Sequence, residues 1–246
     1  MNKAITCGIA VLVATTVGHA AEKKTAPKGK KSAPNPAFAQ VEDVPGLLRV
    51  LLIGDSISIG YTVPVRDLLK GKANVHRIPT NGGPTINGLK HLDAWLGTSK
   101  WDVIHFNWGL HDLKYMGPNG ASLADPRSPD SHQQVPLPDY ERNLRQLVDR
   151  LKRTGAKLIW RNTTPIPEGA AGRVPGDEVK YNEAAARVMK VADVITEDLY
   201  QHSLAGPKNI QLPANVHYTA QGYQYLAQHV AAAIEAQLPR KPPAPK

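Results

Sequence analysis

Short apolar runs alternate along this chain with longer amphipathic stretches, and this alternation constrains the fold more than any other feature of the sequence. Residues 48–53 form a largely apolar run that ends at Gly54, the pattern of a strand buried on both faces. The other predicted strands are residues 75–78, 103–108, 157–160 and 194–195, and the predicted helices are residues 61–70, 85–96, 138–154, 176–191 and 219–236. Strands separated by such helices indicate right-handed crossovers and a parallel sheet covered on both faces. We therefore predict an α/β fold, a three-layer α/β/α sandwich around a central, mostly parallel five-stranded sheet.

The N-terminal residues have the pattern of a secretory signal peptide. Lys3 is followed by an apolar stretch over residues 4–17, and small residues at Gly18 and Ala20 suit signal peptidase. The apolar stretch is shorter than the roughly 20 residues that a membrane-spanning helix needs. We expect residues 1–20 to be removed after Ala20, the mature chain to have no transmembrane segment, and the protein to be periplasmic or secreted.

The single cysteine, Cys7, lies within this expected signal peptide. The remaining chain then has no thiol for a disulfide, a cysteine-based zinc site or a cysteine nucleophile. His105 and His111 are conceivable zinc ligands, but their six-residue separation along a strand does not suit joint ligation. We therefore expect no metal ion and no organic cofactor.

Most of the formal net charge of +9 lies outside the predicted domain. Residues 21–46 form a leader rich in Lys, Pro and Ala, and residues 239–246 form a tail rich in Pro and Lys, whereas residues 47–238 carry 21 basic and 18 acidic side chains. We place the folded domain at residues 47–238 and expect no nucleic-acid partner for it. The basic ends are interpreted as solvated tails, with weak adhesion to anionic surfaces as the alternative.

Three loops with polar or glycine residues follow the first three predicted strands. Their sequences are GDSIS, NGGPT and GLHD. Because ligands of open parallel sheets bind outside the carboxyl ends of the strands, all three loops should open on one edge. Ser56 of GDSIS precedes a helix and is either a helix cap or a nucleophile. The loop is not a GxSxG nucleophile elbow, because Ser58 stands at the second glycine position.

A late histidine completes a pattern with these loops. His217 lies just before the last predicted helix, with Thr219 as the expected cap of that helix. An early GDS, a glycine-containing second loop, a GxxD third loop and this histidine together resemble the SGNH, or GDSL-like, hydrolases over about residues 48–236. The resemblance implies the flavodoxin-like sandwich of that family and ester hydrolysis by a serine nucleophile.

The resemblance implies a role for each matching residue. Ser56 would be the nucleophile, and its backbone N–H would be one donor of the oxyanion hole. Gly83 would give a second backbone donor, with Gly82 as the alternative if the register differs by one residue. His217 would take the proton from Ser56 and return it to the leaving alcohol. The residues named as possible support for this site are Asp55, Asn107, Asp112 and Asn215.

The third loop departs from the family pattern GxND, because His111 falls at the asparagine position. A neutral imidazole has one N–H donor and would complete the oxyanion hole if Asp112 or a backbone carbonyl fixed its tautomer. A structural histidine beneath the loop is the alternative. Asn107 is a second candidate for a polar contact there, or else a satisfied core amide.

The last block departs further. The family commonly has DxxH, and Ala214 stands at the aspartate position. Asn215 follows it, but an amide would not offset the imidazolium charge as a carboxylate does. Three explanations compete: a Ser–His dyad held by a backbone carbonyl, an acid from elsewhere such as Asp193 or Asp198, or a site without activity. The dyad is preferred because His217 keeps its setting before the last helix.

Two long connections, residues 110–137 and 161–175, are expected to form walls of a substrate cleft. The sequence thus predicts an exported serine esterase that acts through an acyl-Ser56 intermediate. By family analogy and export, the preferred substrates are O-acetyl groups on carbohydrate, either a small molecule or a polysaccharide. A lipid acylhydrolase or lysophospholipase is the second choice, and a non-catalytic glycan-binding relative is the alternative from another class.

Overall fold

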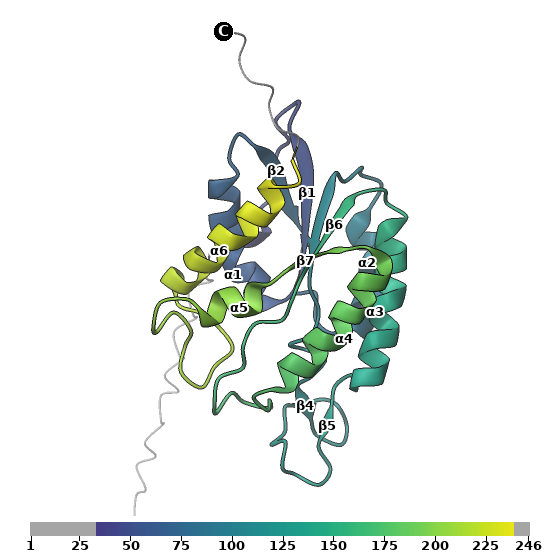
Figure 1. Ribbon diagram of the computed structural model, residues 1–246, viewed down its shortest axis with the longest axis vertical. Helices are drawn as coiled ribbons and strands as arrows, with labels where there is room; N and C mark the ends of the chain where they lie inside the picture. Colours follow the sequence, from purple (N-terminus) through teal and green to yellow (C-terminus); the bar gives the residue numbers. More distant parts are fainter. Residues whose placement is uncertain (1–32, 239–246) are drawn as a thin grey trace, which may run out of the picture. The chain divides into compact units, whose positions relative to one another are not determined.

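Five strands form one sheet in the computed structural model, which describes residues 33–238 (Figure 1). The strands are β1 (Leu48–Ile53), β2 (Ala73–Arg77), β3 (Val103–Phe106), β6 (Lys157–Arg161) and β7 (Ile195–Glu197), in the spatial order β2-β1-β3-β6-β7. Every neighbouring pair is parallel. This is the flavodoxin-like order, in which the chain reverses its direction of winding beside β1. The expected signal peptide and C-terminal tail, and most of the leader, lie outside the described residues.

Helices cover both faces of the sheet, so the predicted three-layer sandwich is confirmed (Figure 1). On one face lie α1 (Ser56–Leu68), α5 (Leu199–Leu204) and α6 (Ala220–Glu235), and on the other lie α2 (Thr85–Leu96), α3 (Leu137–Lys152) and α4 (Asp177–Ala192). None of the helices in residues 33–238 combines the length and the apolar character that a membrane crossing requires.

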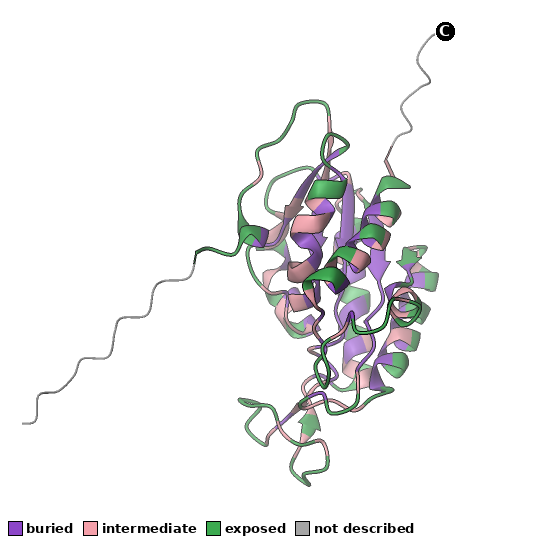
Figure 2. Ribbon diagram, turned by 90° about the vertical axis from the view of Figure 1, so that its left-hand side faces the viewer, coloured by how far each residue is buried: buried purple, intermediate pink, exposed green. Residues whose placement is uncertain are grey.

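The core lies between the sheet and the two helical layers, as the purple strands of Figure 2 show. All four residues of β3 are buried, because this strand lies at the centre of the sheet and is covered on both faces. The outward faces of the helices are exposed. Helix α3 has an amphipathic sequence, and its apolar face is the one that is buried against the core.

Helix α1 begins at Ser56, five residues earlier than the predicted start at Tyr61. Gly60, a poor helix former just before the predicted start, lies inside the helix. Tyr223 of α6 explains the glycine, because a Cβ added at Gly60 would lie 2.2 Å from its ring. The cap of α1 is Asp55, whose Oδ1 accepts a 3.0 Å hydrogen bond from the N–H of Ile57. Ser56 is therefore not the cap of the helix.

The connection from β3 to α3 contains a small antiparallel hairpin that the sequence did not reveal. Its strands are β4 (Tyr115–Met116) and β5 (His132–Gln133). The hairpin extends beyond the sandwich and is largely exposed (Figure 2). A short 3₁₀ helix, η1 (Pro36–Phe38), precedes the sheet. The pairing of β4 with β5 thus gives regular structure to part of the long connection after β3.

Candidate active site

Ser56 and His217 meet at the carboxyl edge of the sheet, although 161 residues separate them in the sequence. Nε2 of His217 lies 2.8 Å from Oγ of Ser56. Ser56 is the first residue of α1, three residues after the end of β1, and His217 lies two residues before the cap of α6. The structure thus brings together the two residues on which the expected chemistry depends.

Backbone hydrogen bonds fix the loop that carries His217. The carbonyl of His217 accepts from the N–H of Leu212 at 2.9 Å, and the N–H of Thr219 donates to the carbonyl of Ile210 at 2.8 Å. Thr219 caps α6, as expected, because its hydroxyl accepts a 3.1 Å hydrogen bond from the N–H of Gly222. The position of His217 is therefore fixed by backbone hydrogen bonds to residues 210–212 and by the capped start of α6.

Asn215 orients the imidazole. Its Oδ1 lies 2.7 Å from Nδ1 of His217 and also accepts the backbone N–H of His217 at 3.0 Å. An amide oxygen can only accept, so Nδ1 carries the proton and Nε2 is left to accept from the hydroxyl of Ser56. Ala214 has φ 51°, and this left-handed turn precedes the asparagine. The side chain of Asn215 thus does what the sequence analysis assigned to a backbone carbonyl.

Neither acid proposed from elsewhere in the sequence reaches His217. Oδ1 of Asp198 accepts from Nδ2 of Asn162 at 2.7 Å and from the N–H of Gln201 at 3.0 Å, because it caps α5. Asp193 ends α4 in a left-handed conformation with φ 55°. Within residues 33–238, neither side chain forms a hydrogen bond or an ion pair with His217, and that of Asp198 is committed to the start of α5.

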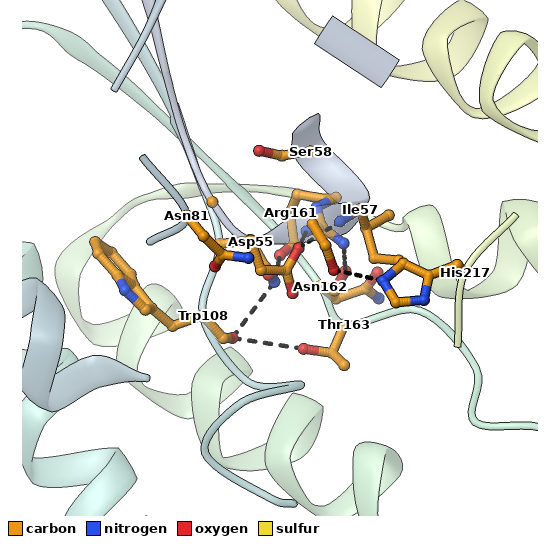
Figure 3. A network of polar contacts seen from close by, with 12 residues as sticks. Asp55, Ile57, Ser58, Asn81, Trp108, Arg161, Asn162, Thr163 and His217 are labelled. Atoms are coloured by element: carbon orange, nitrogen blue, oxygen red, sulfur yellow. Dashed lines mark hydrogen bonds and ion pairs between the residues drawn. The ribbon is translucent and has the colours of Figure 1, made fainter. Parts of the chain in front are cut away.

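A buried ion pair lies beneath the serine. Nη2 of Arg161 is 3.6 Å from Oδ1 of Asp55, and both side chains are almost wholly buried. The guanidinium also lies over the ring of Tyr61, 5.9 Å from its centroid, and burial raises the pKa of that phenol to about 12. Asp55 was a predicted supporting residue, whereas the sequence analysis placed Arg161 in the connection 161–175 and did not foresee its pairing with Asp55. Its charge balances that of the carboxylate next to Ser56 (Figure 3).

The glycines of the second loop approach the first loop closely. The N–H of Gly82 donates to the carbonyl of Gly54 at 2.9 Å, and a Cβ on Gly82 would lie 3.0 Å from that oxygen. Gly83 has φ 61°, and its N–H donates to Oδ1 of Asn81 at 2.9 Å. The N–H of Gly82 is therefore already bound to a backbone carbonyl. The N–H of Gly83 is bound only to the side chain of Asn81, which can rotate away. Asn81 was also missed, although an asparagine two residues before a glycine is a signal for such a turn.

His111 lies half-buried near this edge, and its ring makes no hydrogen bond with the described part of the chain. Burial lowers the pKa of His111 to about 4, and the positive charges of Lys114 and Arg173 act in the same direction. The imidazole is therefore neutral near pH 7 and retains one N–H donor. The charges of Asp55 and His217 also act on it, which indicates that His111 lies near both.

Asp112 does not orient His111, contrary to one expectation from the sequence. Its Oδ1 accepts from the backbone N–H of Thr85 at 2.8 Å and from the Thr85 hydroxyl at 2.5 Å. The carboxyl group is fully buried at the start of α2, and burial raises its pKa to about 7. Asp112 thus joins the third loop to α2.

Asn107 takes the structural role that the sequence analysis left open. Its Nδ2 donates to the carbonyl of Arg161 at 2.7 Å, so the amide ties the end of β3 to the end of β6. Asn107 is buried, as expected of a core amide. Across residues 33–238, no three side chains of His, Cys, Asp or Glu gather as a metal site would require.

A serine hydroxyl paired with an imidazole, at the start of a helix beside the carboxyl ends of a parallel sheet, defines the site of a serine hydrolase. The first residue of α1 also has an N–H without an acceptor inside the helix, as an oxyanion site needs. The chain belongs to the GDSL-like lipase/acylhydrolase family, which it matches over residues 52–225, and it is an ester hydrolase. The resemblance found in the sequence is thereby confirmed.

Solved structures with the same fold include several hydrolases of this kind. The lipase/acylhydrolase from Enterococcus faecalis is 18% identical, with a TM-score of 0.64 over 79% of this chain and 99% of its own. The acetylxylan esterase Axe2 from Geobacillus stearothermophilus is 17% identical, with a TM-score of 0.60 over 79% and 97%. The acetyl xylan esterase AlAXEase is 15% identical, with a TM-score of 0.60 over 76% and 100%. No curated protein matches the sequence.

Proposed function

We propose that this protein is an exported serine esterase that removes O-acetyl groups from carbohydrate through an acyl-Ser56 intermediate. The observation that carries the proposal is the 2.8 Å contact between Oγ of Ser56 and Nε2 of His217, with Nδ1 of His217 held by Asn215. This geometry supports proton transfer from the hydroxyl to the imidazole as Oγ attacks an ester carbonyl. The signal-like N-terminus is the basis for proposing export.

The attack forms a C–O bond to Ser56 and converts the carbonyl into a tetrahedral oxyanion. Three donors support this charge: the N–H of Ser56 at the start of α1, the N–H of Gly83, and the neutral ring of His111. The N–H of Gly83 would exchange its bond to Asn81 for one to the oxyanion. The positive end of the α1 dipole adds to the stabilisation.

Collapse of the intermediate breaks the bond to the alcohol, which leaves with the proton held on His217. Water then gives a proton to the same Nε2 and attacks the acyl carbon, and Ser56 is released together with a carboxylic acid. Each step needs only the residues already named and one water molecule. His217 acts as base and then as acid in both halves of the reaction.

The choice of acetyl esters on carbohydrate rests on the family, the expected export and the names of similar folds. Two of the solved structures with this fold are acetyl xylan esterases. The other candidates, a lipid acylhydrolase and a non-catalytic glycan-binding relative, become outcomes of the test.

The test compares the purified wild-type chain with Ser56→Ala on 4-nitrophenyl acetate, acetylated glucomannan and lysophosphatidylcholine. We expect acetate release by the wild type and a fall of about 10³-fold or more in the variant. Hydrolysis of the lysolipid alone would favour the lipid enzyme, and equal background rates in both proteins would favour the binding module. The mass of the exported protein would show whether cleavage follows Ala20.

A further inference from the structure

A cavity of about 660 Å³ lies next to the loops that carry His111 and His217. Its walls come from the connection after β3 and the connection after β6, and consist of residues 123–127 and 168–175. Gly169 lies against the histidine loop, because a Cβ added there would be 3.1 Å from Cβ of Ala214. On the other side, Nε of Arg173 donates to the carbonyl of Leu110 at 3.2 Å, next to His111. The cavity is therefore placed to receive the part of an ester that extends beyond Ser56.

Two cations lie side by side on the two connections. The N–H of Tyr115 donates to the carbonyl of Gly172 at 2.7 Å, and this bond makes Lys114 and Arg173 neighbours. Both side chains are half-buried. Burial lowers the pKa of Lys114, and the charge of Arg173 lowers it further. Two adjacent positive charges in a partly buried place repel each other unless an anion joins them.

No carboxylate of the described residues forms an ion pair with either cation. Asp55 pairs with Arg161, and Asp112 is bound to Thr85. On the cavity wall, Asp125 pairs with Arg127 at 2.8 Å, and Glu168 is exposed and pairs with neither cation. Neither cation thus has an ion-pair partner among residues 33–238, although the charge of Asp55 acts on Arg173 and that of Asp112 acts on Lys114.

Arg173 is held ready for an anion. Nε and Nη1 donate to the carbonyls of Leu110 and Ala171, each at 3.2 Å, and these bonds fix the plane of the guanidinium. Nη2 makes no hydrogen bond within residues 33–238, and Arg173 is one of the residues that line the cavity. A guanidinium fixed in this way loses little side-chain entropy when it binds a carboxylate.

We propose that Arg173 and Lys114 bind a carboxylate on the alcohol part of the substrate, so that the preferred ester is borne by an acidic, uronate-containing polysaccharide. This inference rests on the proposed function, because it assigns a substrate class to the same site. Arg173 supplies a fixed guanidinium, and Lys114 supplies a second positive charge. Both residues act on substrate selection, whereas Ser56 and His217 act on the ester bond.

The test measures kcat/KM for acetylated polygalacturonate, which is anionic, and for acetylated glucomannan, which is neutral. We expect the wild type to favour the anionic polymer by about 10-fold or more, and 0.5 M salt to reduce this preference. Arg173→Gln should bring the ratio of the two values close to one, and Lys114→Gln should lower it less. Arg173→Lys should keep part of the preference.

The matched control is Arg153→Gln, which removes one positive charge from an exposed residue at the end of α3. Its ratio should remain that of the wild type. A wild-type ratio near one, or an equal loss of preference in Arg153→Gln and Arg173→Gln, overturns the proposal. If the wild type hydrolyses neither polymer nor 4-nitrophenyl acetate, the proposed function itself fails. Circular dichroism of each variant shows that it is folded, and Lys114→Gln provides a second test if Arg173→Gln is not.

Discussion

Oδ1 of Asn215 accepts a hydrogen bond from Nδ1 of His217 at 2.7 Å, so a neutral amide holds the imidazole beside Ser56. The amide fixes the tautomer in which Nε2 can accept a proton. It does not offset the positive charge that forms on the ring during the reaction, as a carboxylate would. Asn215 thus orients the imidazole but does not compensate its charge, whereas an aspartate at this position would do both.

Asn215→Asp should restore charge compensation. We expect kcat/KM for 4-nitrophenyl acetate to rise by about 10-fold or more, since loss of the acid in a serine protease costs about 10⁴. A carboxylate also favours the imidazolium, so the acidic limb of the pH profile should move to higher pH. Asn209→Asp makes the same change at an exposed position in the loop before His217 and should have little effect. Equal rates for Asn215→Asp, Asn215→Ala and the wild type would show that Asn215 does not support His217.

His111 should act through its N–H group. We expect His111→Ala to lower kcat by about 10² to 10³, the usual cost of one oxyanion-hole donor, with a smaller change in KM. His111→Asn keeps an N–H donor of similar reach and should retain most of the activity. Steady-state kinetics on 4-nitrophenyl acetate separate the two variants. If His111→Ala is as active as the wild type, the ring has a structural role only.

Asp112 should make the stability of the fold depend on pH. Burial raises its pKa to about 7 from the ordinary value of 3.8, so between these values the folded chain holds a proton that the unfolded chain has lost. This group therefore lowers the free energy of unfolding as the pH rises from about 4 to about 7. Asp112→Asn removes the titration and keeps an acceptor for Thr85, so its stability should fall less over that range.

Urea unfolding of the wild type and Asp112→Asn at about pH 5 and about pH 8 measures this difference. Asp149→Asn, an exposed change on α3, serves as the control and should follow the wild type. Parallel curves for all three proteins would mean that the carboxyl group of Asp112 does not take up a proton on folding.

Gly222 should be intolerant of a side chain. A Cβ there would lie 2.2 Å from the carbonyl oxygen of Ile210, a backbone atom that cannot move without shifting the histidine loop. We expect Gly222→Ala to destabilise the fold by about 3 kcal/mol and to lower kcat, because α6 and His217 would separate from Ser56. Gly117→Ala, where the nearest atom would be 3.8 Å away, is the control. Thermal unfolding followed by circular dichroism compares them, and equal Tm values would contradict the expectation.

The sandwich could be predicted because the central strands β1 and β3 are short, mostly apolar runs and the long helices between strands have an apolar face. The start of α1 could not, because Gly60 lowers the helix propensity just before the predicted start, and packing against Tyr223 of α6 compensates for it. The two-residue strands β4 and β5 and the six-residue helix α5 are too short to show a period. Their positions depend on contacts that only the folded chain provides.

The site was predictable to the extent that parallel strands bring their following loops to one edge. Ser56, Gly83, His111 and His217 follow from that rule together with the family pattern. The partner of His217 did not, because the turn at Ala214 decides which side chain reaches Nδ1, and a left-handed alanine has no sequence signal. The burial of Arg161 was not predicted, because a charged residue at the end of a strand is expected to be exposed unless its partner, here Asp55, is known.

The separation of Ser56 and His217 along the chain has a consequence for biosynthesis. The nucleophile is made early, just after the first strand, but the base that activates it emerges only after the ribosome has completed nearly the whole sandwich. A nascent or C-terminally clipped chain would carry an inert serine. Ester turnover therefore reports the last event of assembly, and refolding followed by activity should lag behind refolding followed by helix content.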